Sequence, residues 1–94
     1  MNKLEQAREI INNVDKELIE LFKKRMMASK MVAEFKSENN MPVFDESREK
    51  SLKEKNLLIL NNKELEKYYL TFLEGILKAS KDYQKDLIKW NMLY

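Results

Sequence analysis

The sequence predicts an all-helical fold of three helices, in a chain that needs a second copy of itself. The 94 residues include one glycine and one proline, so turn chemistry is scarce and the elements must be few and long. The β-branched residues are scattered and never alternate with polar residues over the length of a strand. A chain of this length has room for one domain, residues 1–94, whose core is small unless a partner extends it.

The first predicted helix covers residues 3–39, a segment without a helix breaker. Apolar residues recur along it at steps of three and four, with one interruption by an arginine. This stripe comprises Leu4, Ala7, Ile11, Val14, Leu18, Leu21, Arg25, Ala28, Val32 and Phe35. Such a stripe is typical of a long helix that packs along one seam. Asn39, Asn40 and Pro42 are then expected to end the helix.

Two shorter helices are predicted to follow. Asp45 can cap the first turn of the second helix, and the pair Asn61–Asn62 forms the turn after it. The third helix covers about residues 63–89, and its stripe consists of Leu65, Tyr69, Phe72, Ile76, Ser80, Tyr83 and Leu87. Gly75 costs about 1 kcal/mol inside a helix relative to alanine, and we expect close helix packing to be the reason for it. Trp90 and Tyr94 follow no pattern that predicts either packing or fraying.

The length of the first helix predicts a homodimer. A helix of that length spans about 55 Å, whereas a compact domain of this size has a radius of gyration of only about 12 Å. Its N-terminal half must therefore protrude from the rest of the chain. This half carries apolar seam residues that need a covering surface, and a second copy of the chain is the economical way to supply one.

Composition excludes several classes of function. Cysteine and histidine are both absent, which excludes disulfides, thiol chemistry, histidine-based catalysis and the usual zinc sites. Charged residues make up 36% of the chain but nearly cancel to +2, which argues against a nucleic-acid-binding surface. The N-terminus lacks an apolar signal-peptide core, and the longest apolar run, residues 57–60, is too short to span a membrane. We therefore expect a cytoplasmic protein with neither a nucleic-acid nor a membrane partner.

The arginines are the first candidates for binding a ligand. Of the 18 basic residues only Arg8, Arg25 and Arg48 are arginine, a side chain that binds carboxylates in a bidentate geometry. Surface ion pairing is the plainer interpretation of any one of them. Surface ion pairing explains Arg25 least well, because Arg25 lies on the apolar seam, where a charge is costly without a counter-ion. A lone charge on the seam can also set the register of a coiled coil.

Spacing along the first helix adds two further candidates. Lys36 lies 11 residues after Arg25, which places both on one helix face about 16 Å apart. Arg8 lies 17 residues before Arg25, or about 25 Å along the helix axis. No small metabolite spans that distance. If Arg8 and Arg25 share a ligand, Arg8 must come from a different chain.

Polar residues on the later helices complete the candidates. Ser80 and Gln84 form an i, i+4 pair that projects toward one face, where they either find buried partners or lie exposed at the edge of the stripe. Asp45 and Glu49 are also spaced i, i+4. Helix capping explains Asp45, and weak magnesium binding by the two carboxylates is the alternative.

In their order and spacing, these residues resemble the all-helical chorismate mutase family, the AroQ type, over nearly the whole chain. The matching pieces are AREIINNVDKELIELFKKR with Arg8 and Arg25, then Lys36, then PVFDESRE with Asp45, Arg48 and Glu49, and finally ILKASKDYQ with Ser80 and Gln84. The resemblance implies an intertwined homodimer of three-helix chains with two active sites. It also implies that each site takes Arg8 from the partner's first helix and the other seven residues from one subunit.

The resemblance further implies the cofactor-free and metal-free Claisen rearrangement of chorismate, a dicarboxylate, to prephenate on the route to phenylalanine and tyrosine. The expected catalytic residues are Arg8 and Arg25, which would hold the carboxylates, and Lys36 and Gln84, which would donate hydrogen bonds to the ether oxygen. The expected substrate-binding set adds Asp45, Arg48, Glu49 and Ser80. An isochorismate–pyruvate lyase on the same fold is one alternative, and a non-catalytic helical dimerisation module is another. We expect these 94 residues to hold no fused dehydratase or dehydrogenase domain and to be either a stand-alone mutase or a domain excised from a longer enzyme.

Overall fold

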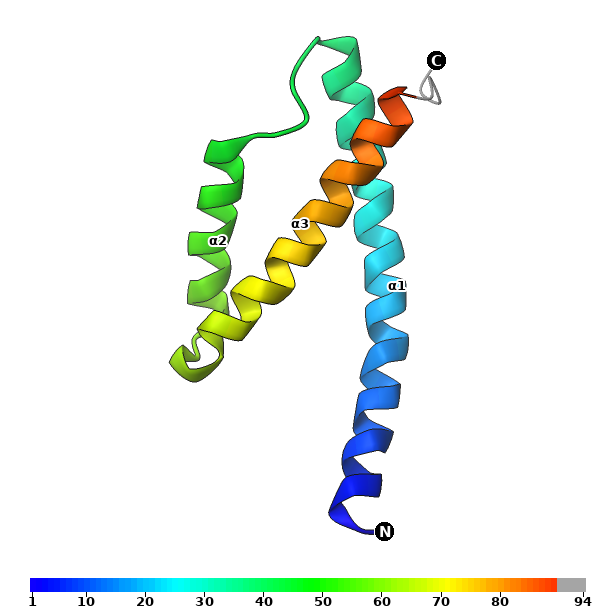
Figure 1. Cartoon of the computed structure of the whole chain (residues 1–94), viewed down its shortest axis with the longest axis vertical. Coiled ribbons are helices and arrows are strands. Elements are labelled where there is room, and N and C mark those ends of the chain that lie inside the picture. Colours follow the sequence, from blue (N-terminus) through cyan, green and yellow to red (C-terminus); the bar gives the residue numbers. More distant parts are fainter. Residues whose placement is uncertain (90–94) are drawn as a thin grey trace.

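The computed structural model describes residues 1–89, which form helices joined by short loops (Figure 1). In chain order the elements are α1 (Lys3–Glu38), α2 (Glu46–Leu60), the 3₁₀ turn η1 (Lys63–Leu65) and α3 (Glu66–Lys89). The prediction of an all-α chain with three helices is confirmed. The first helix ends one residue earlier than predicted, and the third begins with a 3₁₀ turn. Trp90–Tyr94 lie outside the described residues.

The ends of α1 follow from local capping chemistry. The Asn2 side chain accepts a hydrogen bond from the Glu5 N–H at 2.9 Å and so caps the first turn. At the other end the Asn39 N–H donates to Phe35 O, and Asn40 adopts a left-handed conformation with φ of 53°. Asparagine tolerates this conformation better than most residues. The predicted end of the helix at Asn39–Asn40 is confirmed.

Asparagine and aspartate also delimit α2. The Asp45 carboxylate accepts from the Arg48 N–H at 2.9 Å, as the sequence predicts for an N-cap. Asn61 ends the helix in the left-handed conformation, with φ of 46°. The Asn62 side chain then caps η1 by accepting from the Leu65 N–H at 3.2 Å. The chain therefore turns from α2 into α3 within two residues.

α3 is the element that connects the other two helices. It packs against the C-terminal half of α1, diverges from α1 toward its own N-terminus, and packs there against α2 (Figure 1). The N-terminal half of α1 projects away from the rest of the chain (Figure 1). The molecule measures 54 × 27 × 15 Å, and its radius of gyration is 16.6 Å, against about 12 Å for a compact domain of this length. The predicted protrusion of the first helix is confirmed.

Apolar burial within the described residues is small and is centred on the α1–α3 contact. The buried apolar residues are Ala33, Leu73, Leu77 and Leu87. Small side chains on α1, Ser29 and Ala33, face the contact, and small residues allow two helices to approach closely.

The predicted stripes coincide only in part with the faces that the single chain buries. On α1 the seam residues remain exposed, with Leu21 60% and Phe35 59% accessible, while the neighbouring face is buried. On α3 the stripe shares Ser80 and Leu87 with the buried face but is otherwise displaced by one residue. The physical reason is that both helices carry two adjacent apolar faces. Periodicity reveals an apolar face without identifying the helix that covers it.

Gly75 corrects a second expectation. A Cβ atom added at this position would meet nothing within 4 Å apart from its own helix. Close packing against the helices of its own chain is therefore not the reason for the glycine.

Polar contacts join α2 to α3. Lys53 and Glu74 form an ion pair, and the Asn56 amide donates to the Tyr69 hydroxyl at 2.9 Å. The hydrogen bond between Lys53 and Glu74 raises the pKa of Lys53 and lowers that of Glu74. No residue of α2 is fully buried. Half-buried leucines, Leu52, Leu57 and Leu60, and these polar contacts together hold the helix in place within the single chain.

The chain exposes much more surface than a compact monomer of its size. Its accessible surface is 7853 Å², whereas a folded monomer of 11.3 kDa exposes about 5,700 Å². The excess is roughly 2,100 Å², and large apolar residues along α1 contribute to it, among them Leu4, Ile11, Val14, Leu18, Leu21 and Phe22. Within residues 1–89, no helix combines the length and the apolar character that crossing a bilayer requires.

Candidate functional site

All three helices contribute to a cavity of about 310 Å³, a volume within the range of small-molecule sites. Seven of the eight residues proposed from the sequence line it: Arg25, Lys36, Asp45, Arg48, Glu49, Ser80 and Gln84. The remaining lining residues are Ala28, Ser29, Val32, Val43, Leu52, Leu77 and Lys81. Residues that are up to 59 positions apart in the sequence are therefore gathered around one space.

The charges around this cavity favour an anionic ligand. The cationic side chains are Arg25, Lys36, Arg48 and Lys81, and the anionic ones are Asp45 and Glu49. Four positive and two negative charges leave a net charge of +2. A site with this balance attracts a small molecule that carries two negative charges.

Three buried polar side chains form a hydrogen-bonded network on one wall. Ser80 and Gln84 are only 7% and 6% exposed, so the interpretation that they lie exposed at the edge of a stripe is wrong. The Gln84 Nε2 donates to Ser80 Oγ at 3.1 Å, and Ser80 Oγ lies 2.6 Å from Ser29 Oγ. Ser29 in turn donates to the Arg25 carbonyl oxygen at 3.1 Å. One consistent direction of donation therefore runs from Gln84 through both serines to the backbone at Arg25.

Gln84 keeps one unused hydrogen-bonding atom in this network. Its Oε1 is buried and finds no hydrogen-bond partner within the described part of the chain. If the amide turned over, Oε1 would accept from the Ser80 hydroxyl and the NH₂ group would be left without a partner instead. In either orientation one end of a buried amide that lines the cavity remains available, and leaving it unpaired is costly. A ligand in the cavity would remove that cost.

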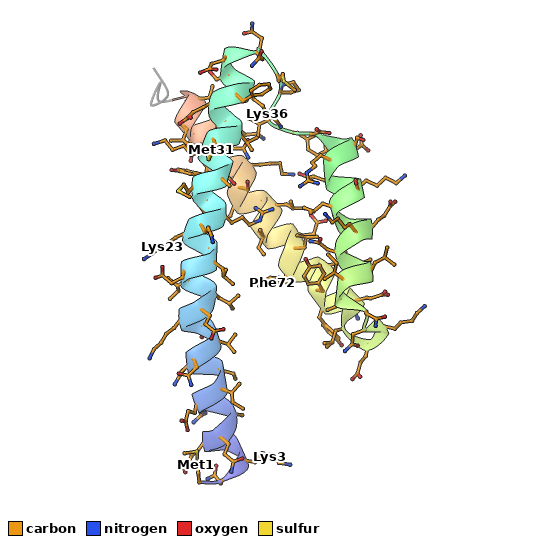
Figure 2. All side chains as sticks on the ribbon, turned by 180° about the vertical axis from the view of Figure 1, so that it is seen from behind. Met1, Lys3, Lys23, Met31, Lys36 and Phe72 are labelled. Carbon is orange, nitrogen blue, oxygen red and sulfur yellow. The ribbon has the colours of Figure 1, made fainter. Side chains whose placement is uncertain are left out.

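Lys36 is placed by the loop between α1 and α2. Its Nζ donates to the Val43 carbonyl oxygen at 2.8 Å, and its own carbonyl oxygen accepts from the Met41 N–H at 2.8 Å. Figure 2 labels Lys36 near the end of α1, where the chain passes toward α2. An ammonium group has three donors, so two remain for a ligand after the bond to Val43.

Glu49 and Lys81 form an ion pair across the α2–α3 contact. Lys81 Nζ lies 3.0 Å from Glu49 Oε2, and the side chains are 27% and 16% exposed respectively. The same ammonium lies 4.8 Å from the centre of the Phe44 ring, within the range of a cation–π contact. Lys81 is therefore held both by α2 and by the loop that precedes it.

Arg8 is the one proposed residue that does not line the cavity. It lies in the exposed N-terminal half of α1, about 25 Å along the axis from Arg25. A rigid helix separates the two guanidinium groups, so Arg8 cannot reach the cavity of its own chain.

The two carboxylates of the magnesium alternative already have partners. Asp45 caps α2, and Glu49 pairs with Lys81. No cluster of three or more potential metal ligands occurs within residues 1–89. The arrangement gives no support to a magnesium site.

Sequence reasoning missed two polar residues of the site, Ser29 and Lys81. Ser29 follows Arg25 by four residues, so the i, i+4 rule could have placed it beside that arginine. Lys81 follows Ser80 directly and has no such signal, because its role depends on the approach of α2.

Residues 7–85 match the family model described as chorismate mutase type II. The chain is 38% identical over 88 residues to a bifunctional chorismate mutase/prephenate dehydratase of Buchnera aphidicola subsp. Schizaphis graminum, covering 93% of this chain and 23% of that protein. It is 42% identical over 90 residues to the protein of the same name from Buchnera aphidicola subsp. Baizongia pistaciae, covering 94% and 24%. The chain thus spans about a quarter of the length of these relatives. No solved structure matches it at a significant level.

Proposed function

Because the chain belongs to the chorismate mutase type II family, we propose that it catalyses the rearrangement of chorismate to prephenate. The observation that carries this proposal is the convergence of seven candidate residues on one cavity with a net charge of +2. Chorismate is a dicarboxylate, so its charge complements that of the cavity.

The reaction needs positioning and electrostatics more than reactive side chains. It is an isomerisation in which the ether C–O bond breaks while a C–C bond forms, with no proton transfer to or from the enzyme. Holding a flexible substrate in the reactive chair can contribute several kcal/mol, up to roughly 7–11 in favourable cases. Fixed hydrogen-bond donors at the ether oxygen stabilise the negative charge that develops there. A chain without histidine or cysteine can supply both effects.

We assign the following roles to the residues around the cavity. Arg25 and a partner's arginine hold the two carboxylates, with support from Arg48 and Ser80. Lys36 and Gln84 donate to the ether oxygen. Two features favour this pair. The Lys36 ammonium keeps two free donors. The buried Gln84 amide leaves its NH₂ group free to donate when it is turned over so that Oε1 accepts from the Ser80 hydroxyl. Glu49 accepts a hydrogen bond from the substrate hydroxyl, and the backbone near Asp45 also contributes to holding this hydroxyl.

A homodimer completes the proposed site. An apolar groove of about 600 Å³ lies where α1 and α3 diverge, and it is lined by Asp15, Leu18, Ile19, Leu21, Phe22, Arg25, Phe72 and Ile76. Arg25 also lines the charged cavity, so the groove and the proposed site adjoin. The protruding half of α1 from a second chain has the apolar residues to fill the groove, and it would carry Arg8 to the cavity. An excess surface of roughly 2,100 Å² per chain suits an obligate interface.

The direct experiment is to incubate the purified chain with chorismate and with isochorismate separately and to identify the products. Prephenate from chorismate is the expected result. Pyruvate and salicylate from isochorismate would instead support the lyase alternative on the same fold. The molar mass in solution, measured on the same sample, should be that of a dimer. An inactive dimer that fails to bind a dicarboxylate transition-state analogue would be a dimerisation module.

The amide side chain of Gln84 leads to a prediction about the pH dependence of turnover. Because Gln84 donates without being protonated, turnover should change little between mildly acidic and neutral pH. The measurement is a kcat profile over that range. A collapse of kcat toward neutral pH would contradict the assignment of Gln84 as a donor to the ether oxygen.

Replacement of Ser80 by alanine should have a moderate effect. The substitution removes the hydroxyl between Gln84 and Ser29 but leaves the cationic side chains in place. We expect kcat/KM to fall about tenfold, since the loss is that of one or two buried hydrogen bonds. Steady-state kinetics with chorismate measures the effect, and thermal unfolding of the same variant separates it from loss of the fold. A fall as large as that of a Lys36 variant would contradict a supporting role for Ser80.

A further inference from the structure

We propose that Lys81 is a positioning residue for substrate binding. It holds the Glu49 carboxylate in the place where that carboxylate accepts a hydrogen bond from the substrate hydroxyl. This inference rests on the proposed function. Its structural basis is the 3.0 Å ion pair between Lys81 Nζ and Glu49 Oε2, two side chains that come from different helices and both line the cavity. No sequence motif identified Lys81.

A carboxylate in this cavity needs a compensating charge. Glu49 is only 16% exposed and would face a guest that carries two negative charges. Like charges at short range in a partly desolvated site repel strongly, and an unpaired buried carboxylate is costly in its own right. Lys81 offsets both costs while it leaves one Glu49 oxygen free to accept from a hydroxyl.

Phe44 limits the positions that Lys81 can occupy. The ammonium lies 4.8 Å from the ring centre, so one side of the group faces the ring and another faces Glu49. A lysine held from two sides loses less conformational freedom when the substrate binds than an unrestrained lysine would. The same holds for the carboxylate with which it pairs. If Lys81 turned instead toward a substrate carboxylate, Glu49 would lose its partner. The geometry therefore favours action through Glu49 over direct contact with the substrate.

Lys53 provides a matched control. It also forms an ion pair between α2 and α3, with Glu74, and it does not line the cavity. If the Glu49–Lys81 pair served only to attach α2, then Lys53→Met and Lys81→Met should have similar effects. If Lys81 positions Glu49, only Lys81→Met should alter the kinetics of substrate use.

The test compares Lys81→Met, Lys81→Arg and Lys53→Met in the full chain with chorismate as substrate. Lys81→Met should raise KM roughly tenfold with kcat nearly unchanged, because binding of the hydroxyl is the same in ground state and transition state. Lys81→Arg should restore most of the loss, and Lys53→Met should leave KM within about twofold of the parent. An equal rise in KM for Lys53→Met, or no rise for Lys81→Met, would overturn the proposal.

Two further measurements separate positioning from direct contact. In a Glu49→Gln background the additional Lys81→Met change should have no further effect on KM, because the residue through which it acts has gone. With a chorismate analogue that lacks the hydroxyl group, parent and Lys81→Met should have similar KM values. An effect that survives in either case means that Lys81 contacts the substrate directly and contradicts the proposal. Absence of turnover by the parent chain itself would refute the proposed function and, with it, this inference.

Discussion

Replacement of Lys36 by alanine is expected to lower kcat by about 10²–10³-fold, the cost of removing one preorganised donor from a site of developing negative charge. In the proposed mechanism the Lys36 ammonium is the charged donor at the ether oxygen, and its bond to Val43 O keeps it in place before the substrate arrives. The interaction strengthens only as the C–O bond breaks. The loss should therefore appear in kcat, while KM changes much less.

The measurement is steady-state kinetics on Lys36→Ala beside a matched lysine on the same helix. Lys23 is exposed, and within residues 1–89 its ion pair is with Glu20, one turn away. Figure 2 labels Lys23 on α1 at a distance from Lys36. Lys23→Ala should retain parental kcat and KM. Thermal unfolding of both variants tests whether loss of the Val43 bond has destabilised the fold. Full activity of Lys36→Ala would refute the role of Lys36 at the ether oxygen.

Replacement of Arg8 by alanine is the second change expected to have a large effect on activity. The proposed role of Arg8 across the interface can be tested by mixing two inactive variants. Arg8→Ala and Lys36→Ala should each be nearly inactive alone, because each removes a charged contact with the substrate. In a mixed dimer, the chain with Arg8→Ala keeps its own Lys36 and receives an intact Arg8 from its partner. One site of each mixed dimer is then complete. With random exchange half of the dimers are mixed, so about one quarter of the parental activity should return.

The control pair is Arg25→Ala mixed with Lys36→Ala. Both residues belong to the same subunit's part of the proposed site, so every site in the mixed dimer lacks one of them and no activity should return. Both mixtures are unfolded and refolded together so that the subunits exchange. If the first mixture stays inactive although mixed dimers have formed, or if Arg8→Ala alone is fully active, Arg8 does not act across an interface.

Much of the fold follows from local chemistry that the sequence displays. Asn2 and Asp45 cap helices, and the left-handed asparagines Asn40 and Asn61 end them. These effects operate within four residues along the chain, so they are the same in any tertiary context. Seven of the eight site residues proposed from the sequence also line one cavity.

The sequence by itself determined the helices, their ends, the excess length of α1 and the candidate residues. The tertiary structure alone decided which apolar face each helix buries, that Ser29 joins Ser80 and Gln84 in one hydrogen-bonded network, and that Lys81 meets Glu49. The physical reason is the distance along the chain over which each kind of interaction acts. Caps and helical periods depend on neighbours within one turn, whereas burial and ion pairing between helices depend on how α3 crosses α1 and α2, which no local pattern encodes.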